Sequence, residues 1–589
     1  MSYAPKLTDE QRSQVEASLG RTAGTNGGPS KTASLIPHHR VRLAAKLVDA
    51  SGVVEAVERW KIEDRVRAGL HAGGAPSKVS VRQALILYKV LALDGKPSNR
   101  KGAAELILYR LFPKSLKMVG LQRSTGTESQ WRDRIWNTID KFLKPMDPMR
   151  LDPSLGGDRR KGQARWHFEE MVASIDPEED EIRMARLHWA MNQLLGTSYE
   201  LVPDYIRDAW NGDVAIDATF TEFDVHHGSR MRDKTPDDTM AVIPHGNYYK
   251  GTLYWGGDFH LGVALPNISY VNDGMPRIII GASFAPCATN PGKMATKILE
   301  SLHERGLGKP DKMKLVPVDL AYFPTPKPED FQAPARRLNF APIGVFSKKQ
   351  QGIHGGYDGL IQVEDDFYCP FTPRPLLESS VDRWVNGTID DETWRQRKAQ
   401  ARKYSVWDKE RPRPDGSRRV GCPAIGPNPK LTCSNCPSSA PKNAAALPHI
   451  HAPEMLSCCG KTTVVPGEVA VRFSQPLKWG SDEHAEKFKS GRSTNEAVNG
   501  LMKRDSEFGL ADPGRRKLRG FAGQFFQATL VAFSYNVHRI DAHLRAIRDG
   551  KVPDPHPDRN NGWEIVKDAV AKAAPEPTEP SANGPPLAA

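Results

Sequence analysis

The chain has 589 residues, of which 39% are hydrophobic and 26% charged, and it lacks the run of roughly 18–20 apolar residues that a membrane-spanning helix needs. This composition excludes a mainly membrane-embedded protein and, at roughly 100–200 residues per domain, predicts two to four domains. Lys and Arg number 82 against 70 Asp and Glu, and the net charge of +12 favours a polyanionic partner, nucleic acid first.

Cysteine usage and the N-terminal sequence indicate the compartment. The chain has seven cysteines, and five of them lie between Cys422 and Cys459, which disfavours a secreted disulfide scaffold. The first residues lack the apolar core of a signal peptide. We therefore expect a cytoplasmic protein with reduced thiols and no membrane contact.

The first third of the chain has a helical pattern. Residues 1–35 are rich in Gly, Ser, Thr and Asn and predict a flexible arm. Apolar residues at three- and four-residue spacing across 36–210 predict an all-α N-terminal domain. Its many Arg and Lys suit a DNA-binding domain of the helix-turn-helix kind, although a helical bundle with solvated charges explains them equally well.

Near residue 212 the spacing of apolar residues changes from the helical pattern to that of strands. Within 211–356, one helical segment separates the third and fourth of five strand-like segments, which predicts an α/β fold with a mixed sheet and flanking helices. Residues 357–480 are Pro-rich and contain the Cys cluster, so we expect an insertion with a few strands, among them 467–479. Helical patterns return over 481–550, and the Pro- and Ala-rich residues 551–589 predict a disordered tail.

Two aspartates follow short apolar runs. Asp217 lies in the sequence VAIDATF and Asp319 in LVPVDLAY, each at the expected end of a strand. Ligand sites in α/β sheets gather at such ends, and a buried Asp costs several kcal/mol unless it is paired or bound to a metal. Two such residues on neighbouring strands would offer the oxygen ligands that Mg²⁺ prefers.

A third carboxylate is expected from the C-terminal helices, and the candidate is Glu496. Arg492 precedes it by four residues and Lys503 follows it by seven, so one helix would carry all three on one face. That face could hold a metal with its acid and phosphate oxygens with its cations. An ordinary solvated face with an i,i+4 ion pair is the alternative reading. Glu496 is preferred over the neighbouring acids Glu483, Glu486 and Glu507, because its spacing places it on the same helix face as Arg492 and Lys503.

These residues together resemble a DDE transposase of cut-and-paste insertion sequences. That family shows Asp-x-Thr after its first strand, as in Asp217-Ala-Thr219, and an Asp with a nearby Tyr after its fourth strand, as in Asp319-Leu-Ala-Tyr322. Its third motif is Tyr-x(2)-Arg-x(3)-Glu-x(6)-Lys. Arg492, Glu496 and Lys503 match its spacing, while Lys489 stands where the family has Tyr.

The resemblance implies a fold and a chemistry. It implies an RNase H-like catalytic core with a β-rich insertion between the second and third acids. It also implies that the three acids bind two Mg²⁺ ions, for which Mn²⁺ is a possible substitute. These ions would serve the cleavage and strand transfer of double-stranded DNA at terminal inverted repeats and target sites. The active form would be an oligomer assembled on DNA. A catalytically inactive, transposase-derived DNA-binding protein and a metal-dependent nuclease remain alternatives.

Two basic segments are further candidates for DNA contact. Residues 393–420 contain ten Lys and Arg against three Asp and Glu, with Trp394, Tyr404 and Trp407 interleaved. Cations among aromatics suit a nucleic-acid backbone and unstacked bases, but a solvated charged segment has the same composition. A second basic patch follows the Glu496 segment and comprises Arg515, Arg516, Lys517 and Arg519.

The cysteine spacing permits a zinc site. A single Cys-x-x-Cys motif, Cys433 to Cys436, lies between Cys422 and the pair Cys458-Cys459, with two histidines in the same stretch. Such thiols could hold a structural zinc ion, and free thiols in a reducing cell are the alternative. Cys287 and Cys369 read as isolated thiols.

Overall fold

The computed structural model describes residues 8–551, with gaps at 23–34, 72–76, 149–172, 174–175, 224–246, 250–251, 270–273, 437–445 and 460–461 and at eight single positions. The predicted tail and most of the predicted arm therefore lie outside the described residues. No helix in the described part of the chain is long and apolar enough to cross a membrane.

Helices form nearly all of the described structure before residue 210. They are α2 (His38–Ala50), α3 (Val53–Arg67), α4 (Val81–Leu93), α5 (Arg100–Glu105), α6 (Pro113–Val119), α7 (Glu128–Leu143), α9 (Pro177–Gly196) and α10 (Asp204–Ala209), with short 3-10 and π turns. Helix α1 (Asp9–Thr22) precedes them. It lies within the segment predicted as a flexible arm, so that prediction was wrong for these residues: α1 packs against helix α18 (Phe521–Arg548), and Val15 is fully buried.

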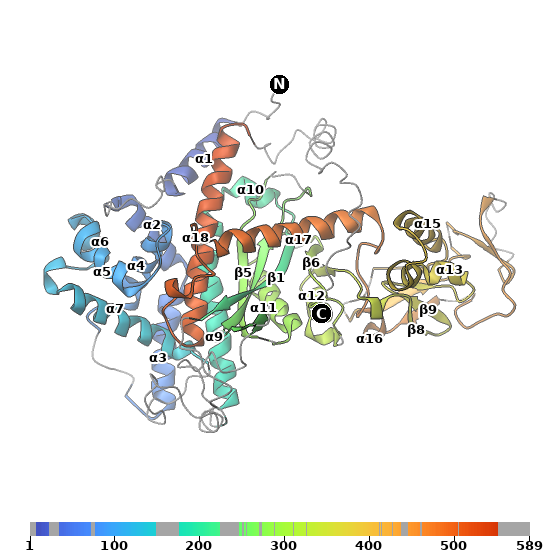
Figure 1. Cartoon of the computed structure of the whole chain (residues 1–589), viewed down its shortest axis with the longest axis horizontal. Helices are drawn as coiled ribbons and strands as arrows, with labels where there is room; N and C mark the ends of the chain where they lie inside the picture. The colour runs from blue at the N-terminus through green and yellow to red at the C-terminus, as the bar shows by residue number, and fades with distance from the viewer. Residues whose placement is uncertain are drawn as a thin grey trace.

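Two small sheets, linked by one bridge, form the centre of the molecule (Figure 1). Strands β1 (Val214–Glu222), β4 (Gly256–Ala264) and β5 (Ile279–Pro286) pair antiparallel in the order β1-β4-β5. Strands β6 (Lys314–Pro317) and β7 (Phe340–Ile343) pair in parallel. A parallel bridge between Ile216 and Val318 joins β1 to the end of β6. The mixed α/β class is thus as predicted, with the strands in several small sheets; β2 (Asn247–Tyr249) and β3 (Thr252–Tyr254) form a two-stranded antiparallel sheet of their own.

Helices cover the sheet and bind its edge strand. Helix α11 (Pro291–Glu304) packs on β4 and β5, so closely that a Cβ on Gly262 or Gly281 would meet the side chain of Ile298. The outer edge of β5 is closed by amide side chains: Asn192 of α9 exchanges two hydrogen bonds of 2.8 Å with the backbone of Ala282, and Asn536 of α18 exchanges two, of 2.7 and 2.6 Å, with that of Ile279. These bonds satisfy backbone groups that would otherwise invite another strand.

One hydrophobic core runs from the N-terminal helices through the sheet to α18. It includes Val41 of α2, Leu87 of α4, Phe259 of β4 and Phe533 of α18, all fully buried. The sequence predicted an N-terminal domain of its own. The helices are present, but they share their core with the sheet and α18 because α4 and α9 pack directly on α18.

The insertion forms a separate lobe of short elements to the right in Figure 1. Its elements are β8 (Ile353–Tyr357), β9 (Leu360–Val363), β10 (Asp366–Tyr368), α13 (Arg374–Leu377), α14 (Ser379–Val381), α15 (Asp391–Ala401), β11 (Trp407–Asp408), β12 (Arg418–Gly421), β13 (Thr432–Cys433), β14 (His449–Ile450), β15 (Thr462–Val465) and α16 (Gly467–Ala470). The predicted strand at 467–479 was wrong, because this stretch starts with α16. The lobe has small apolar clusters of its own.

Some side chains of the basic segment 393–420 are buried inside this lobe, while most of its cations, such as Arg395 and Lys403, are exposed. Trp394 is 8% exposed and packs edge-on against Trp479, while Lys398 forms a buried ion pair with Glu364. Arg418 is 4% exposed and pairs with Asp366 and Asp408. These side chains therefore stabilise the interior of the lobe. They neither form a surface on which bases could stack nor belong to a solvated charged segment.

Candidate functional site

Strand β1 presents the first acid. Asp217 is its fourth residue, opposite Leu261 of β4, so the strand continues past the aspartate and does not end there as the sequence suggested. The backbone N–H of Ala218 donates to Asp217 Oδ1 at 2.8 Å, and Asn499 Nδ2 donates to Oδ2 at 3.2 Å. The carboxylate is therefore held in one orientation from two sides.

The second acid follows strand β6 directly, as predicted. Val318, the residue before Asp319, forms the bridge to Ile216, the residue before Asp217. The two aspartates therefore leave neighbouring backbones at the same level of the sheet. The N–H of Ala321 donates to Asp319 Oδ1 at 2.8 Å, and the N–H groups of Tyr322 and Phe323 donate to its backbone carbonyl. This turn fixes the direction of the Asp319 side chain.

The third acid comes from helix α17 (Asp482–Lys503), which begins where the insertion ends. Ser481 caps the helix by accepting a hydrogen bond from the N–H of His484 at 3.2 Å. The helix crosses the end of β6 closely at Gly491, where an added Cβ would lie 2.5 Å from Cβ of Pro317. Glycine thus allows the approach that brings Glu496 toward the sheet.

All three predicted acids line one open cavity of about 330 Å³. Asp217 and Asp319 form its floor with Ile216, Pro317 and Val318, and α17 contributes the facing wall. The lining from α17 consists of Phe488, Arg492, Asn495 and Glu496. The three acids that the sequence singled out, which are distant in the chain, thus line the same cavity.

The charges in this cavity act on one another. The pKa of Asp217 is raised to about 6, first by burial and then by the negative charge of Asp319, with a smaller contribution from Glu496. Arg492 works in the opposite direction. Burial lowers the pKa of Lys503, while Asp217 raises it. A poorly solvated carboxylate next to two other acids is a site that a cation would stabilise.

Glu496 is engaged by a neighbour on its own helix. Arg492 Nε donates to Glu496 Oε1 at 2.9 Å, and both side chains are about 60% exposed, at 58% and 60%. As the side chains stand, no three Cys, His, Asp or Glu within the described residues are close enough to hold a metal ion together. Glu496 thus belongs to the cavity wall and is ion-paired in this arrangement.

Four further side chains support the acids, and of these the sequence had named only Tyr322, as part of the Asp319 motif. Asn499 bonds Asp217, and Asn495 places a buried Oδ1 without a hydrogen-bond partner at the cavity wall. Beneath the floor, Tyr322 and His260 of β4 share a buried hydrogen bond of 2.7 Å between the Tyr322 hydroxyl and His260 Nδ1. Asn495 and Asn499 are four residues apart on α17, which places them on one helix face, and this was the available signal.

Burial controls the protonation of the Tyr322–His260 pair. It lowers the pKa of His260 to about 4, so the ring is neutral at pH 7. Burial, with the charges of Asp217 and Asp319, raises the pKa of Tyr322 well above its ordinary value. The tyrosine therefore keeps its proton and can donate to the neutral ring, which makes the pair an uncharged support beneath the acids.

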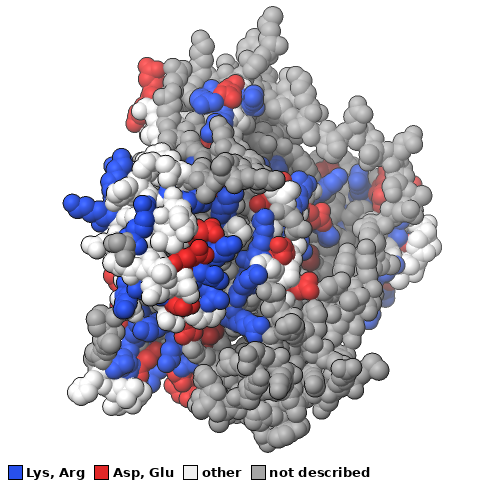
Figure 2. Space-filling view, turned by 60° about the vertical axis from the view of Figure 1, so that its left-hand side comes forward, with Lys and Arg blue, Asp and Glu red and all other residues white. Residues whose placement is uncertain are grey.

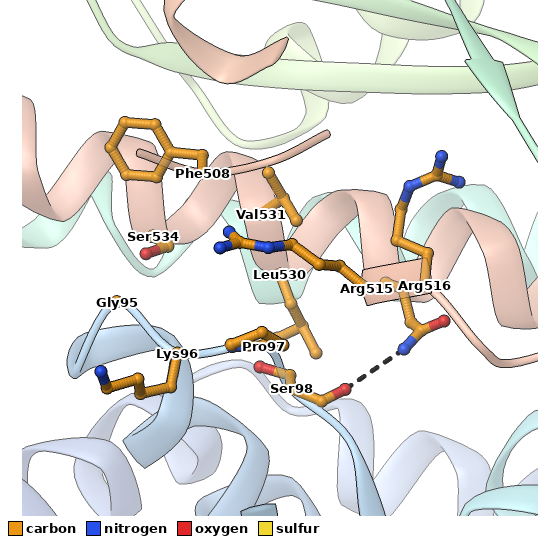
Figure 3. Close-up of a pocket in the computed structure, with 11 residues that line it drawn as sticks. Gly95, Lys96, Pro97, Ser98, Phe508, Arg515, Arg516, Leu530, Val531 and Ser534 are labelled. Carbon is orange, nitrogen blue, oxygen red and sulfur yellow. Dashed lines mark hydrogen bonds between the residues drawn. The ribbon is translucent and has the colours of Figure 1, made fainter. Parts of the chain in front are cut away.

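The predicted basic patch after α17 divides into two kinds of residue. Lys517 and Arg519 are exposed, and Arg515 lines a second cavity, of about 410 Å³, between residues 95–98 and α18 (Figure 3). Arg516 also touches that cavity but is 1% exposed, and its guanidinium donates to Gln524 Oε1 and to the carbonyl of Glu222. Arg516 was therefore wrongly assigned to DNA contact, because its donors are bound inside the protein.

Positive charge is widespread on the surface but not uniform. Figure 2 shows many Lys and Arg side chains on one face, with Asp and Glu distributed among them. The net charge of +12 thus does not collect into a single basic surface on that face.

The predicted zinc ligands lie in the insertion. Cys433 and Cys436 are buried in one apolar cluster with Cys422 packed against it, and Cys458 and Cys459 are buried in a second. The sequence treated Cys369 as an isolated thiol, and this was wrong: it belongs to the first cluster and interacts with Cys422, Cys458 and Cys459.

Neither a scan against models of protein families nor searches of curated proteins and of solved structures found a match for this chain. The candidate function therefore depends on the residues and the geometry described above.

Proposed function

We propose that this chain is a DDE transposase, which cuts DNA at the ends of an insertion sequence and joins the freed ends to a target. The observation that carries the proposal is the cavity shared by Asp217, Asp319 and Glu496, which lie 102 and 177 residues apart in sequence. A solvated helix face, the alternative for Glu496, would not need to meet two strand-borne aspartates.

The arrangement of the sheet supports an RNase H-like core. Asp217 lies on β1, the first strand of the central layer, and Asp319 follows β6, the fourth of its strands in chain order. The insertion separates Asp319 from Glu496. Each of these positions is the one that the resemblance to DDE transposases implies.

The donor set fits divalent cations. It offers three carboxylates and the buried amide oxygen of Asn495, which are hard oxygen ligands of the kind that Mg²⁺ and Mn²⁺ prefer. The pKa of Asp217 is raised by burial and then by the negative charge of Asp319, and a bound cation would offset both effects. Two bound ions would supply an activated nucleophile and stabilise the leaving oxygen in phosphodiester cleavage.

The chain's own residues would do the positioning. Asn499 and the Ala218 N–H hold the Asp217 carboxylate, so that its orientation is set before DNA binds. Arg492 must release Glu496 for the acid to bind metal, and its freed guanidinium would then be available to hold a DNA phosphate as a fork of donors. Lys503, near Asp217, would contribute a point charge to the same phosphate backbone.

A cleavage assay tests the proposal. The purified chain is incubated with labelled DNA carrying the sequences that flank its reading frame, with Mg²⁺, Mn²⁺ or chelator, and nicked and joined products are resolved. We expect metal-dependent nicks at the ends of inverted repeats and strand-transfer products with added target DNA. Cleavage without joining would instead identify a nuclease, and binding without cleavage a DNA-binding protein with no chemistry.

A further inference from the structure

The second cavity, of about 410 Å³, lies where three distant parts of the chain meet (Figure 3). Its lining comes from the loop 95–98 after α4, from residues 508 and 515–516 after α17, and from the face of α18 that carries Leu530 and Ser534. It shares no described residue with the cavity of the three acids. A ligand of this second cavity would therefore not need the acids.

The described lining of this cavity is basic. It contains Lys96, Arg515 and Arg516 and no Asp or Glu. The guanidinium of Arg516 is bound inside the protein, and Figure 3 shows it pointing away from that of Arg515. Asp94, two residues before Lys96, has both carboxylate oxygens bound by buried arginines. Lys96 and Arg515 are therefore the two cations that can meet a ligand here.

The side chain of Arg515 is held in place. It lies against Gly509, where an added Cβ would be 2.5 Å from Arg515 Cδ and 2.7 Å from Nη1. Gly509 has a φ of +63°, a left-handed conformation that favours glycine. The ion pair of Arg515 with Asp512 spans 3.9 Å, which is too long for a hydrogen bond. The guanidinium thus has a fixed support and keeps donors that Asp512 does not take.

Lys96 comes from a loop that is tied to α18. The backbone N–H of Lys96 donates to the carbonyl of Leu91 at 2.9 Å, at the end of α4. Gln527 of α18 donates to the Ser98 carbonyl at 3.2 Å, and the Ser98 hydroxyl donates to the carbonyl of Tyr88 at 3.1 Å. The Lys96 side chain itself is exposed. A fixed loop therefore presents an ammonium group that is able to reach a ligand in the cavity.

One wall of the cavity is apolar. It consists of Phe508 with Leu530 and Val531 of α18. Phe508 is half-buried, and its ring packs edge-on against Tyr535 and His538, with ring centroids 5.5 and 5.3 Å apart. A small inorganic anion would use the two cations only. A phosphate with an attached sugar or base would also contact this wall, and cations beside an aromatic ring suit such a ligand.

We propose that this cavity binds one nucleotide phosphate, with Lys96 and Arg515 on the phosphate oxygens and Phe508 against the attached sugar or base. Arginine offers a fork of donors and lysine a point charge, and both suit phosphate. Ser534, which is 7% exposed, adds a hydroxyl to the lining. A free nucleotide and a nucleotide within a DNA strand offer the same chemistry.

Equilibrium dialysis of the full-length chain with labelled deoxyadenosine monophosphate tests the site. We expect saturable binding of one nucleotide per chain, weaker binding of inorganic phosphate, and none of deoxyadenosine, which lacks the phosphate. Lys96→Ala and Arg515→Ala should each weaken binding about tenfold, because each removes a charged hydrogen-bond donor. Lys101→Ala is the matched control, since it removes an exposed lysine of α5 that does not line the cavity, and it should bind like wild type.

A short DNA duplex, added as a competitor, separates the two sources of the phosphate. Displacement of the labelled nucleotide supports a phosphate of a DNA strand as the occupant. In that case the site extends the DNA contact on which the proposed function rests. Binding that the duplex leaves unchanged supports a free nucleotide as the occupant.

A footprint on the wild-type chain covers variants that fail to fold. Lysines are acetylated with an amine-reactive reagent in the presence and absence of the nucleotide, and the modified positions are read by mass spectrometry. The nucleotide should protect Lys96 and leave Lys101 unchanged.

Three results would overturn the proposal: no saturable binding of the nucleotide, equal modification of Lys96 with and without it, or a Lys101→Ala variant that binds as weakly as Lys96→Ala. Nucleotide binding at Lys96 by a chain that cleaves no DNA would leave this site standing and overturn only the proposed function.

Discussion

Asn499 and Asp217, 282 residues apart in the chain, share a hydrogen bond of 3.2 Å that ties helix α17 to strand β1. The bond lies one helical turn beyond Glu496. It therefore holds α17, which carries the third acid, close to β1, which carries the first. Anything that moves α17 away from the sheet should separate Glu496 from the two aspartates.

Two glycines of α17 allow that idea to be tested on one helix. Gly491→Ala should push the helix off β6, because the new methyl group would lie 2.5 Å from Cβ of Pro317. We expect a loss of about 1–3 kcal/mol in unfolding free energy, typical of overpacking, together with a large loss of DNA cleavage. Thermal unfolding and the cleavage assay are the two measurements.

Gly500→Ala is the matched control. A Cβ at Gly500 meets no atom within 4 Å. The substitution should stabilise the helix by up to about 1 kcal/mol, because alanine has the higher helix propensity. Equal effects of the two substitutions on cleavage would show that the close approach at Gly491 does not position Glu496.

The charge on Asp217 should cost stability, and the cost should depend on pH. Its pKa is raised from 3.8 to about 6 in the folded protein, so folding favours the protonated form. This contribution to stability is complete below about pH 4 and is lost as the pH rises through about 6. Asp217→Asn should therefore stabilise the protein above pH 6 by up to about 3 kcal/mol, with little effect near pH 4.

Unfolding temperatures of wild type and Asp217→Asn, measured from pH 4 to 8, check this sign. The same variant should be inactive in DNA cleavage, so stability and activity should change in opposite directions. Added Mg²⁺ at pH 7 should raise the unfolding temperature of wild type and have less effect on the variant. A variant less stable than wild type at pH 7 would show that Asp217 is well solvated or paired.

Glu496→Gln should abolish cleavage and leave the fold intact. Its side chain is 60% exposed, and an exposed ion pair such as that with Arg492 contributes about 0–1 kcal/mol. Glu486→Gln, an exposed acid on the same helix, should cleave normally. If Glu486→Gln were the inactive variant, the assignment of the third acid would be wrong.

The neighbours Arg516 and Lys517 should have opposite roles. Arg516→Ala removes a buried guanidinium and leaves Gln524 and the Glu222 carbonyl without their donors, which should cost about 2–4 kcal/mol of unfolding free energy. Lys517→Ala should leave stability within about 0.5 kcal/mol and weaken DNA binding, with a shallower dependence of affinity on salt. Thermal unfolding and binding titrations at several salt concentrations separate the two.

The strands and helices of the core were largely predictable because their patterns are strong. The apolar runs around Ile216 and Val316, and the long amphipathic pattern that became α18, fixed the strands and the helix in order. The spacing of Arg492, Glu496 and Lys503 likewise predicted that one helix carries all three, and all three lie on α17. Local periodicity is enough for such elements because each buries one continuous face.

The errors arose where long-range packing decides the role of a charged or polar residue. Lys398 and Arg418 read as surface cations, yet buried carboxylates far away in the chain hold them inside the lobe. Arg516 is indistinguishable from Lys517 by sequence. The supporting roles of His260 and Asn499 are visible only in the folded structure, because no local pattern encodes partners that are 62 and 282 residues away in the chain.

The order of the acids along the chain has a consequence for synthesis. Asp319 leaves the ribosome 177 residues before Glu496, and α18, which closes the edge of β5, follows later still. At roughly 5–20 residues per second, the nascent protein passes many seconds with two acids and no third. A growing polypeptide therefore lacks the third acid of the proposed site until helix α17 has been made.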